Sequence, residues 1–246
     1  MSLLQLEGVT KRFGGLLAVD NVSLEIDSGE AISIVGPNGS GKTTLFNLIS
    51  GVYAPDQGKV IFDGLEITHL PPYRRAHLGI GRTFQIPRPF GSLTVRESGA
   101  VGAMFGAHEH SMGVDEALQS ADERLRLMGF YELRERPARE LTPVEMKMME
   151  IARALAMKPK LLLLDESMAG MPPKDIDALV QLLKGIKQKE GIAVIAMVEH
   201  IMRAVVGFAE RVIVLYQGRK MLEAPTAQAL SDPRVVDVYL GKELEQ

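Results

Sequence analysis

The sequence contains no cysteine among its 246 residues, which excludes disulfide bonds and thiolate metal sites and is compatible with a cytosolic protein. No apolar run approaches the roughly 20 residues that a membrane-spanning helix needs. The N-terminus also lacks the pattern of a signal peptide. A formal net charge of −3 gives no sign of a surface that binds nucleic acid. We therefore expect a chain with no membrane anchor of its own and no nucleic-acid partner.

Hydrophobic residues make up 46% of the chain, enough to form a core over most of its length. A chain of 246 residues can form one α/β domain with a subdomain, or two small lobes. No internal repeat or low-complexity tract divides the sequence. We expect a single domain that covers residues 1–246.

One glycine-rich segment fits the pattern G-x-x-x-x-G-K-[ST], which a chain of this length contains by accident only about one time in a hundred. The segment reads Gly36, Pro37, Asn38, Gly39, Ser40, Gly41, Lys42, Thr43 and Thr44. A strand-like run at residues 31–35 precedes it, and a helical pattern at residues 44–50 follows it. Backbone N–H groups of such a loop surround phosphates, its lysine reaches the outer phosphates and its hydroxyl (Thr43) holds Mg²⁺. The segment predicts binding of a nucleoside triphosphate.

Several apolar patterns predict the strands around this loop. An antiparallel sheet is expected from alternating patterns at residues 3–9, 22–26 and 59–62. Buried parallel strands are expected from apolar runs at residues 161–164, 193–198 and 212–215. Helical patterns at residues 144–156 and 176–189 separate these runs, which is the βαβ alternation of a parallel sheet.

Residues 90–141 contain no strand-like run, only helix-compatible sequence with glycine breaks. We expect an inserted helical subdomain at about residues 90–155. The predicted fold class is therefore α/β: a P-loop nucleotide-hydrolase core on a parallel sheet, with an N-terminal antiparallel β subdomain and an inserted helical lobe.

Two acidic residues, Asp165 and Glu166, follow the apolar run at residues 161–164. In P-loop proteins a carboxylate at this place organises the metal and its waters, and a second one can accept a proton from the attacking water or orient it. An isolated Asp-Glu pair is more often a solvated strand end. Coupled to Lys42, the pair predicts Asp165 as the metal organiser and Glu166 as the catalytic base.

His200 follows another apolar run, and ligands of α/β sheets gather at the carboxyl ends of parallel strands. A single histidine is more often structural, but this position favours contact with the γ-phosphate. The other histidines have no such placement. His108 and His110 are expected in a solvated loop rather than a metal site, because nothing near them completes a ligand set.

Over about residues 3–241 these motifs together resemble the ATP-binding subunits of ABC transporters. The resemblance implies that Gln85, in the segment Arg82-Thr83-Phe84-Gln85, touches Mg²⁺ and the attacking water and senses the membrane subunit. It implies that His200 is the family's switch histidine and that Phe13 stacks on adenine. Residues 167–171 match the loop that crosses the dimer interface. The implied catalytic set is then Lys42, Gln85, Glu166 and His200.

Narrower features resemble the ATPases of uptake systems for branched-chain and other hydrophobic amino acids. These features are residues 13–16, 82–85, 90–94 and 238–241. Importers of that kind pair two related ATPases with two membrane permease subunits and a periplasmic solute-binding protein. The resemblance implies a peripheral protein at the cytoplasmic face of the membrane, with the permease docking near residues 85–92 and beyond.

The family's signature, L-S-G-G-Q or a near variant, is degenerate in this chain. The segment before the helix at residues 150–155 reads Leu141, Thr142, Pro143, Val144 and Glu145. In the family, this segment holds the γ-phosphate bound to the opposite subunit through its hydroxyl and backbone N–H groups. Thr142 keeps a hydroxyl, but Pro143 has no N–H and Val144 has a β-branched side chain where glycine allows close approach. The signature should be a poor phosphate clamp.

An intact phosphate loop beside a degenerate signature favours a heterodimer with one active site. The active site would combine Lys42 and Glu166 of this chain with the signature of a second, related ATPase. A symmetric dimer in which Thr142 suffices is the alternative.

Three other functions are alternatives to a transport ATPase. A soluble ABC-type ATPase that acts on nucleic acid or ribosomes is disfavoured by the charge and by the absence of tandem ATPase domains. A nucleotide-binding regulator with weak hydrolysis stays open because of the degenerate signature. A small-molecule kinase is disfavoured by the combination of Gln85, the helix at residues 150–155 and His200.

Overall fold

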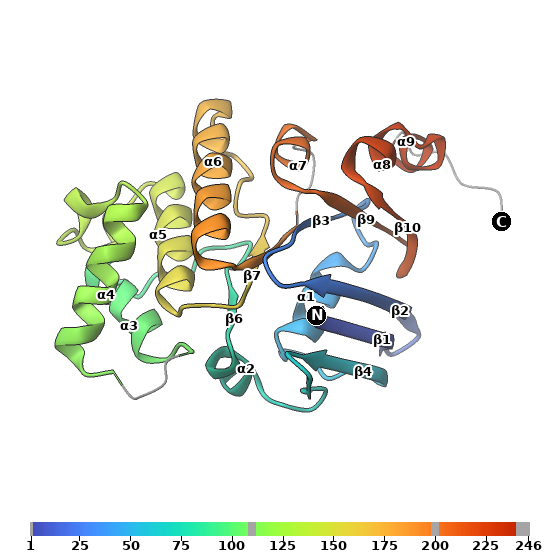
Figure 1. Ribbon diagram of the computed structural model, residues 1–246, viewed down its shortest axis with the longest axis horizontal. Helices are drawn as coiled ribbons and strands as arrows, with labels where there is room; N and C mark the ends of the chain where they lie inside the picture. The colour runs from blue at the N-terminus through green and yellow to red at the C-terminus, as the bar shows by residue number, and fades with distance from the viewer. Residues whose placement is uncertain (1, 108–111, 198–201, 240–246) are drawn as a thin grey trace.

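The computed structural model describes residues 2–107, 112–197 and 202–239, which form two sheets with helices packed around them (Figure 1). The antiparallel sheet has the order β2-β1-β4-β5 and contains β1 (Ser2–Phe13), β2 (Leu16–Asp27), β4 (Gln57–Phe62) and β5 (Leu65–Glu66). The second sheet has the order β10-β9-β3-β8-β7-β6 and contains β3 (Ala31–Val35), β6 (Ile80–Arg82), β7 (Leu161–Asp165), β8 (Ala193–Met197), β9 (Arg211–Tyr216) and β10 (Arg219–Pro225). Its strands pair in parallel except at the β9–β10 edge.

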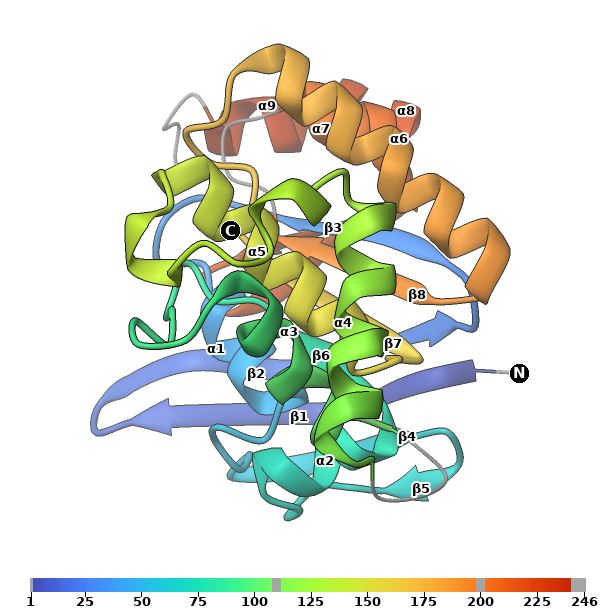
Figure 2. The same cartoon turned by 90° about the vertical axis from the view of Figure 1, so that its left-hand side faces the viewer.

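The helices surround this second sheet. They are α1 (Lys42–Ile49), α2 (Pro72–Leu78), α3 (Val95–Met104), α4 (Val114–Leu127), α5 (Pro143–Ala156), α6 (Pro173–Glu190), α7 (Met202–Phe208), α8 (Thr226–Ser231) and α9 (Pro233–Tyr239), with short 3-10 turns at Tyr131–Leu133 and Ala138–Glu140. Helices α3, α4 and α5 lie side by side at one end of the molecule (Figure 2). None of the helices within the described residues is long and apolar enough to cross a membrane.

The parallel sheet is buried on both faces, and β3 illustrates how its sequence achieves this. Ile32 and Ile34 pack into one core with α1 and the antiparallel sheet. Ala31 and Val35 point the other way, into a core shared with α5, α6 and α7. Since successive side chains of a strand alternate between faces, a run that is apolar except for the buried Ser33 serves both cores. This sandwich holds the carboxyl ends of the strands in fixed places.

The predicted fold class and the main predicted elements are confirmed. The antiparallel strands are longer than their alternating patterns, because β1 carries register irregularities that interrupt the alternation. The helix predicted from residue 144 begins at Pro143, a favourable first helical position for proline. The sequence patterns did not predict β6 or β10. For β6 the reason is that it has only three residues and one of them is glycine. The limits of the helical subdomain, at about residues 90–155, stay a prediction.

Candidate functional site

The phosphate loop runs from the end of β3 into the first turn of α1. Two of its glycines are required by close approach: a Cβ on Gly36 would lie 2.1 Å from the carbonyl oxygen of Leu215, and one on Gly41 would lie 2.4 Å from that of Ala18. Both also have positive φ, of 150° and 100°. The loop therefore keeps its backbone N–H groups at the start of a helix, where the helix dipole favours an anion.

Lys42 is folded over this loop. Its ammonium donates hydrogen bonds to the carbonyl oxygens of Gly36 (2.7 Å) and Pro37 (2.9 Å), and the residue is only 3% exposed. The lysine thus lies across the segment that is predicted to hold phosphate. A phosphate oxygen in the loop would be an alternative, charged acceptor for the same ammonium.

A pocket of about 430 Å³ gathers most of the predicted nucleotide-binding residues. It is lined by Phe13, Leu16, Ala18, Asn38, Gly39, Ser40, Gly41, Lys42, Thr43, Thr44, Gln85 and Glu166. Phe13 stands at the rim with 40% of its surface exposed and packs edge-on against Tyr53, at 5.1 Å between ring centroids. Four segments that are distant in the chain thus meet around one space of the size that a small-molecule ligand needs.

The two predicted water-handling residues face each other in this pocket. The Nε2 of Gln85 donates to the Oε2 of Glu166 at 2.7 Å. Glu166 has a φ of 47°, an unusual conformation for a glutamate that costs free energy and is found preferentially at functional sites. The side chains come from two neighbouring parallel strands, one from the loop after β6 and one from the residue after β7.

Asp165 is the last residue of β7 and is 2% exposed. Its Oδ2 accepts a hydrogen bond from the Nη2 of Arg82 at 2.8 Å, and its backbone N–H donates to the Oγ1 of Thr83 at 3.1 Å. Thr83 also shares a 2.6 Å hydrogen bond with Ser167. Arg82 and Thr83 thus make three hydrogen bonds to the end of β7 and the residues that follow it, two to Asp165 and one to Ser167.

The donors present fit Mg²⁺. This ion takes hard oxygen ligands and is usually bound through one or two carboxylates plus substrate phosphates. The hydroxyl of Thr43, the carboxylate of Asp165 and the amide oxygen of Gln85 would supply such ligands, directly or through water. Within the described residues no group of three or more histidine, cysteine or acidic residues could hold a metal ion by itself, so phosphate and water oxygens would have to complete the ligand set. When bound, the ion would neutralise charge on the phosphates.

Helix α5 forms hydrogen bonds to the backbone next to both Gln85 and Glu166. The sequence patterns did not predict this role. Lys147 donates to the backbone carbonyls of Glu166 (3.2 Å) and Ala169 (2.6 Å). Burial lowers the pKa of Lys147 below its ordinary value, and the nearby Glu166 carboxylate opposes that shift. The link between these residues spans about twenty positions, so no local pattern could have revealed it.

Glu150, one turn further along α5, forms hydrogen bonds to the loop that carries Gln85. It is 2% exposed, and its carboxylate accepts hydrogen bonds from the backbone N–H groups of Phe84 (3.4 Å) and Arg88 (2.7 Å). Arg153 pairs with the same carboxylate at 2.8 Å and donates to the Arg88 carbonyl. An acidic residue in an otherwise apolar helical stretch was the only sequence signal for this contact.

The degenerate signature forms the N-terminus of α5 and does not line the pocket described above. Thr142 is the N-cap: its Oγ1 accepts from the backbone N–H of Glu145 at 3.3 Å, and its own N–H donates to the Glu145 carboxylate at 2.7 Å. Pro143, the first helical residue, has no N–H, and the N–H of Glu145, the third, donates to the cap. The N–H of Val144, the second, is not used by the cap. The hydrogen bond from Thr142 lowers the pKa of Glu145, so the carboxylate is ionised at neutral pH.

His200 and the pair His108 and His110 lie outside the described residues, so their predicted places stay predictions. The other predicted residues of the site fall into two groups. Residues 38–44 of the phosphate loop, Phe13, Gln85 and Glu166 come together around one pocket, with Gly36, Pro37 and Asp165 adjacent to them in the chain but not in its lining, while residues 141–145 lie at the start of α5.

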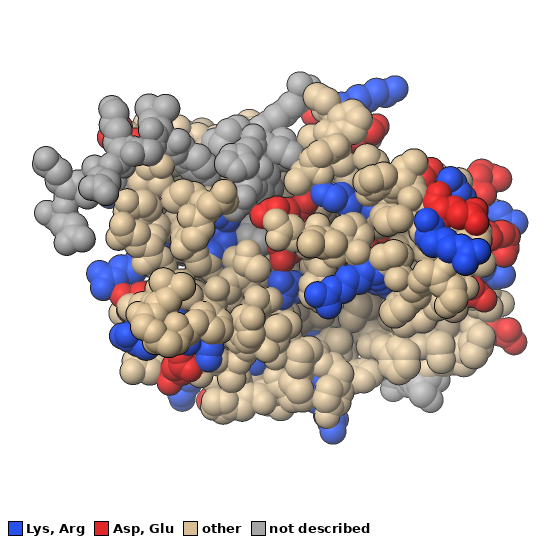
Figure 3. Space-filling model, turned by 180° about the vertical axis from the view of Figure 1, so that it is seen from behind, with Lys and Arg blue, Asp and Glu red and all other residues tan. Residues whose placement is uncertain are grey.

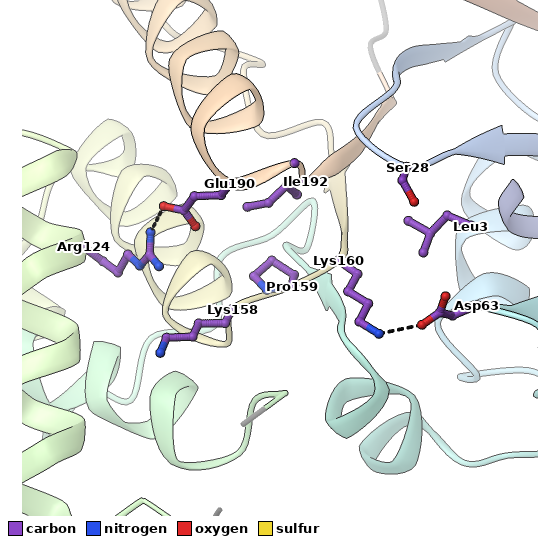
Figure 4. A pocket seen from close by; sticks show the side chains of 10 residues that line it. Leu3, Ser28, Asp63, Arg124, Lys158, Pro159, Lys160, Glu190 and Ile192 are labelled. Atoms are coloured by element: carbon purple, nitrogen blue, oxygen red, sulfur yellow. Dashed lines mark hydrogen bonds and ion pairs between the residues drawn. The ribbon is translucent and has the colours of Figure 1, made fainter. Parts of the chain in front are cut away.

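A second pocket, of about 400 Å³, lies at the amino ends of the parallel strands (Figure 4). Arg124 pairs there with Glu190, and Lys160 pairs with Asp63. Ligands of parallel sheets gather at the carboxyl ends of the strands, so this pocket is on the wrong side of the sheet for the nucleotide.

Comparison with known proteins gives a consistent result. A family model described as ABC transporter matches residues 19–169. The high-affinity branched-chain amino acid transport ATP-binding protein BraF of Pseudomonas aeruginosa is 34% identical over 98% of each chain. The probable branched-chain amino acid transport ATP-binding protein LivG of Archaeoglobus fulgidus is 35% identical over 98% of this chain and 96% of the relative.

Solved structures agree. A nucleotide-free ATP-binding cassette from an ABC transporter superposes with a TM-score of 0.89 at 32% identity, over 98% of this chain and 100% of the other. A dimeric cassette in a post-hydrolysis state, bound to ADP and Pi, gives a TM-score of 0.82 at 28% identity, over 91% of this chain and 98% of the other. A likeness that covers nearly the whole chain, in sequence and in fold, shows that the protein belongs to the ABC transporter family.

Proposed function

We propose that this chain is the ATP-hydrolysing subunit of an importer for branched-chain or other hydrophobic amino acids. The observation that carries the proposal is the Gln85–Glu166 pair, at 2.7 Å, in the same pocket as the phosphate loop. The names of the relatives support the amino-acid substrate class. Solute contacts lie in other chains, so the substrate rests on those relatives alone.

The pocket residues can divide the work of hydrolysis. The loop at residues 36–44 and Lys42 hold the phosphates, and Phe13 packs against the base. Glu166 accepts the proton of the attacking water or orients it, and Gln85 fixes the position of Glu166 by its hydrogen bond. Thr43, Asp165 and the amide oxygen of Gln85 would hold Mg²⁺, directly or through water, and His200 would be a further γ-phosphate contact.

The partner ATPase is a different chain with an intact signature. Support comes from the N-terminus of α5, where Pro143 lacks an N–H and the N–H of Glu145 is used by the cap. The ionised Glu145 carboxylate belongs to the same helix start and would repel a phosphate brought to it. A signature of this kind clamps the opposite nucleotide poorly, so the competent site is the one built on the phosphate loop of this chain.

The permease docks on the loop that follows Gln85. Ile86 is 76% exposed and Phe90 is 43% exposed, and both belong to the loop held by Glu150 and Arg153. Exposed apolar side chains on a connecting loop are typical of a protein interface. The chain acts as a peripheral protein at the cytoplasmic face of the membrane and reaches the solute-binding protein only indirectly.

A nucleic-acid target is not part of this proposal. On the described part of the face in Figure 3, basic and acidic side chains are interspersed with uncharged ones instead of gathering in one basic surface. This agrees with the formal charge of −3.

Reconstitution of the complete transporter tests the proposal. Proteoliposomes that contain this chain, its partner ATPase and their permease subunits, with the solute-binding protein added, should take up labelled leucine when ATP is supplied to the ATPase side. Glu166→Gln should abolish uptake while the complex still assembles. ATP hydrolysis without uptake of any hydrophobic amino acid would reject the importer. Strong nucleotide binding without steady turnover in that complex would favour a regulator.

A further inference from the structure

Arg82 is a nearly buried cation between α1 and the acidic end of β7, and the division of roles proposed above does not use it. Its side chain is 7% exposed and lies at the end of β6, three residues before Gln85. Its Nη2 donates to the Oδ2 of Asp165 at 2.8 Å. Its Nη1 donates to the Oδ1 of Asn47 and the Oγ of Ser50, each at 2.7 Å.

The acceptors of Arg82 come from two functional elements. Asn47 belongs to the last turns of α1, the helix whose first turn carries Lys42 and Thr43, and Ser50 caps that helix. Asp165 ends β7, immediately before Glu166. One planar guanidinium therefore joins the helix of the phosphate loop to the predicted metal carboxylate, with a fixed geometry that a lysine ammonium would not provide.

Neighbouring groups hold the guanidinium itself in place. It lies over the ring of Phe84, at 5.1 Å from the centroid, and near that of Phe46, at 5.9 Å. Thr83, the next residue, accepts the backbone N–H of Asp165. Two consecutive residues thus fix both the side chain and the main chain of Asp165, so the carboxylate has little freedom to turn.

We propose that Arg82 is a positioning residue that orients the Asp165 carboxylate for Mg²⁺ in the nucleotide site. The inference rests on the ATPase function proposed above. Groups that orient a metal-binding side chain without touching the metal typically change metal affinity by about 10- to 100-fold when removed. Arg82 would therefore act on the metal step and leave nucleotide binding through the phosphate loop intact.

Metal binding can be measured separately from hydrolysis. Mn²⁺ would be titrated, with EPR detection of free ion, into the protein saturated with the non-hydrolysable analogue AMPPNP. Arg82→Met should weaken Mn²⁺ binding about tenfold, whereas affinity for the analogue in EDTA should change by less than about twofold. Arg82→Lys should fall between the two proteins, and it carries the test if Arg82→Met does not fold.

A double-mutant cycle tests whether Arg82 acts through Asp165. In an Asp165→Asn background, Arg82→Met should weaken Mn²⁺ binding no further. Arg96→Met is the matched control, because it removes another arginine–aspartate pair, with Asp122 at 2.9 Å, in the helices α3 and α4. That control should leave Mn²⁺ binding unchanged.

Three results would overturn the proposal. The first is unchanged Mn²⁺ affinity in both Arg82 variants. The second is an equal loss of Mn²⁺ and of analogue affinity, and the third is additive effects of Arg82→Met and Asp165→Asn; either of these would make Arg82 a general structural residue. Because every measurement uses binding and not turnover, a failure of this proposal would leave the ATPase assignment untouched.

Discussion

At the scale of single residues, this site depends on groups held in unusual states. Glu166 keeps a positive φ, and Lys42 is buried against the carbonyl groups of its own loop. Neither state would be stable in isolation: the buried ammonium of Lys42 needs the carbonyl acceptors of its own loop, and Glu166 is held by Gln85 from another part of the chain. The residues that touch the nucleotide are therefore only part of the machinery.

Phe13 offers a direct test at this scale. Its place at the rim of the pocket predicts that Phe13→Ala weakens ATP binding about 2- to 10-fold, because an aromatic contact contributes roughly 0.5–1.5 kcal/mol beyond its buried area. Phe13→Tyr should bind ATP as the native chain does. Binding of a fluorescent ATP analogue is the measurement, with Tyr73→Ala, an exposed aromatic outside this pocket, as the control. Equal affinities for the alanine variant and the native chain would remove Phe13 from the base-binding site.

At the scale of elements, α5 connects three functional segments. Its N-terminus is the degenerate signature, Lys147 holds the carbonyls of residues 166 and 169, and Glu150 holds the loop of Gln85. A shift of this helix would therefore move both members of the Gln85–Glu166 pair.

Replacing Glu150 with glutamine tests how strongly the carboxylate of Glu150 stabilises the loop that carries Gln85. A hydrogen bond to a charged group contributes about 1.5–3 kcal/mol, so Glu150→Gln should speed amide exchange at Phe84 and Arg88. We also expect ATP turnover with a competent partner to fall about tenfold, with nucleotide affinity changed by less than about twofold. Glu132→Gln, at an exposed position in a short turn, is the control. Unchanged exchange at residues 84 and 88 would contradict the positioning role.

Sequence patterns predict the elements well and their connections poorly. The phosphate loop and Asp165–Glu166 are contiguous motifs, so their residue types and spacing predicted both the local structure and the chemistry. Arg82, Lys147 and Glu150 act across separations of about 20 to 80 positions, where no periodicity operates. β6 is a strand because it pairs with β7, not because its three residues favour one.

At the scale of the whole molecule, the intact phosphate loop and the degenerate signature lie on separate elements of one chain. Family members with solved structures include a dimeric cassette, which supports pairing of two such chains. In the mixed dimer proposed above, one of the two nucleotide sites would be competent. A dimer of identical chains would combine two intact phosphate loops with two degenerate signatures.

A complementation experiment tests this central claim with the chain itself as its partner. One variant carries a repaired signature, Pro143→Gly/Val144→Gly, together with Glu166→Gln, so it can clamp a nucleotide but not hydrolyse its own. The native chain supplies the phosphate loop and Glu166. Pro143→Gly/Val144→Gly with Glu166 retained verifies the repair, and Glu166→Gln with the native signature is the matched control.

Steady-state ATP hydrolysis of the mixture is the decisive measurement. We expect negligible turnover by the native chain alone and by the repaired Glu166→Gln chain alone. Their mixture should hydrolyse ATP clearly. A mixture of the native chain with the control, Glu166→Gln with the native signature, should not. Robust hydrolysis by the native chain alone, at the rate of the chain with the repaired signature and Glu166 retained, would contradict the account and establish a symmetric ATPase.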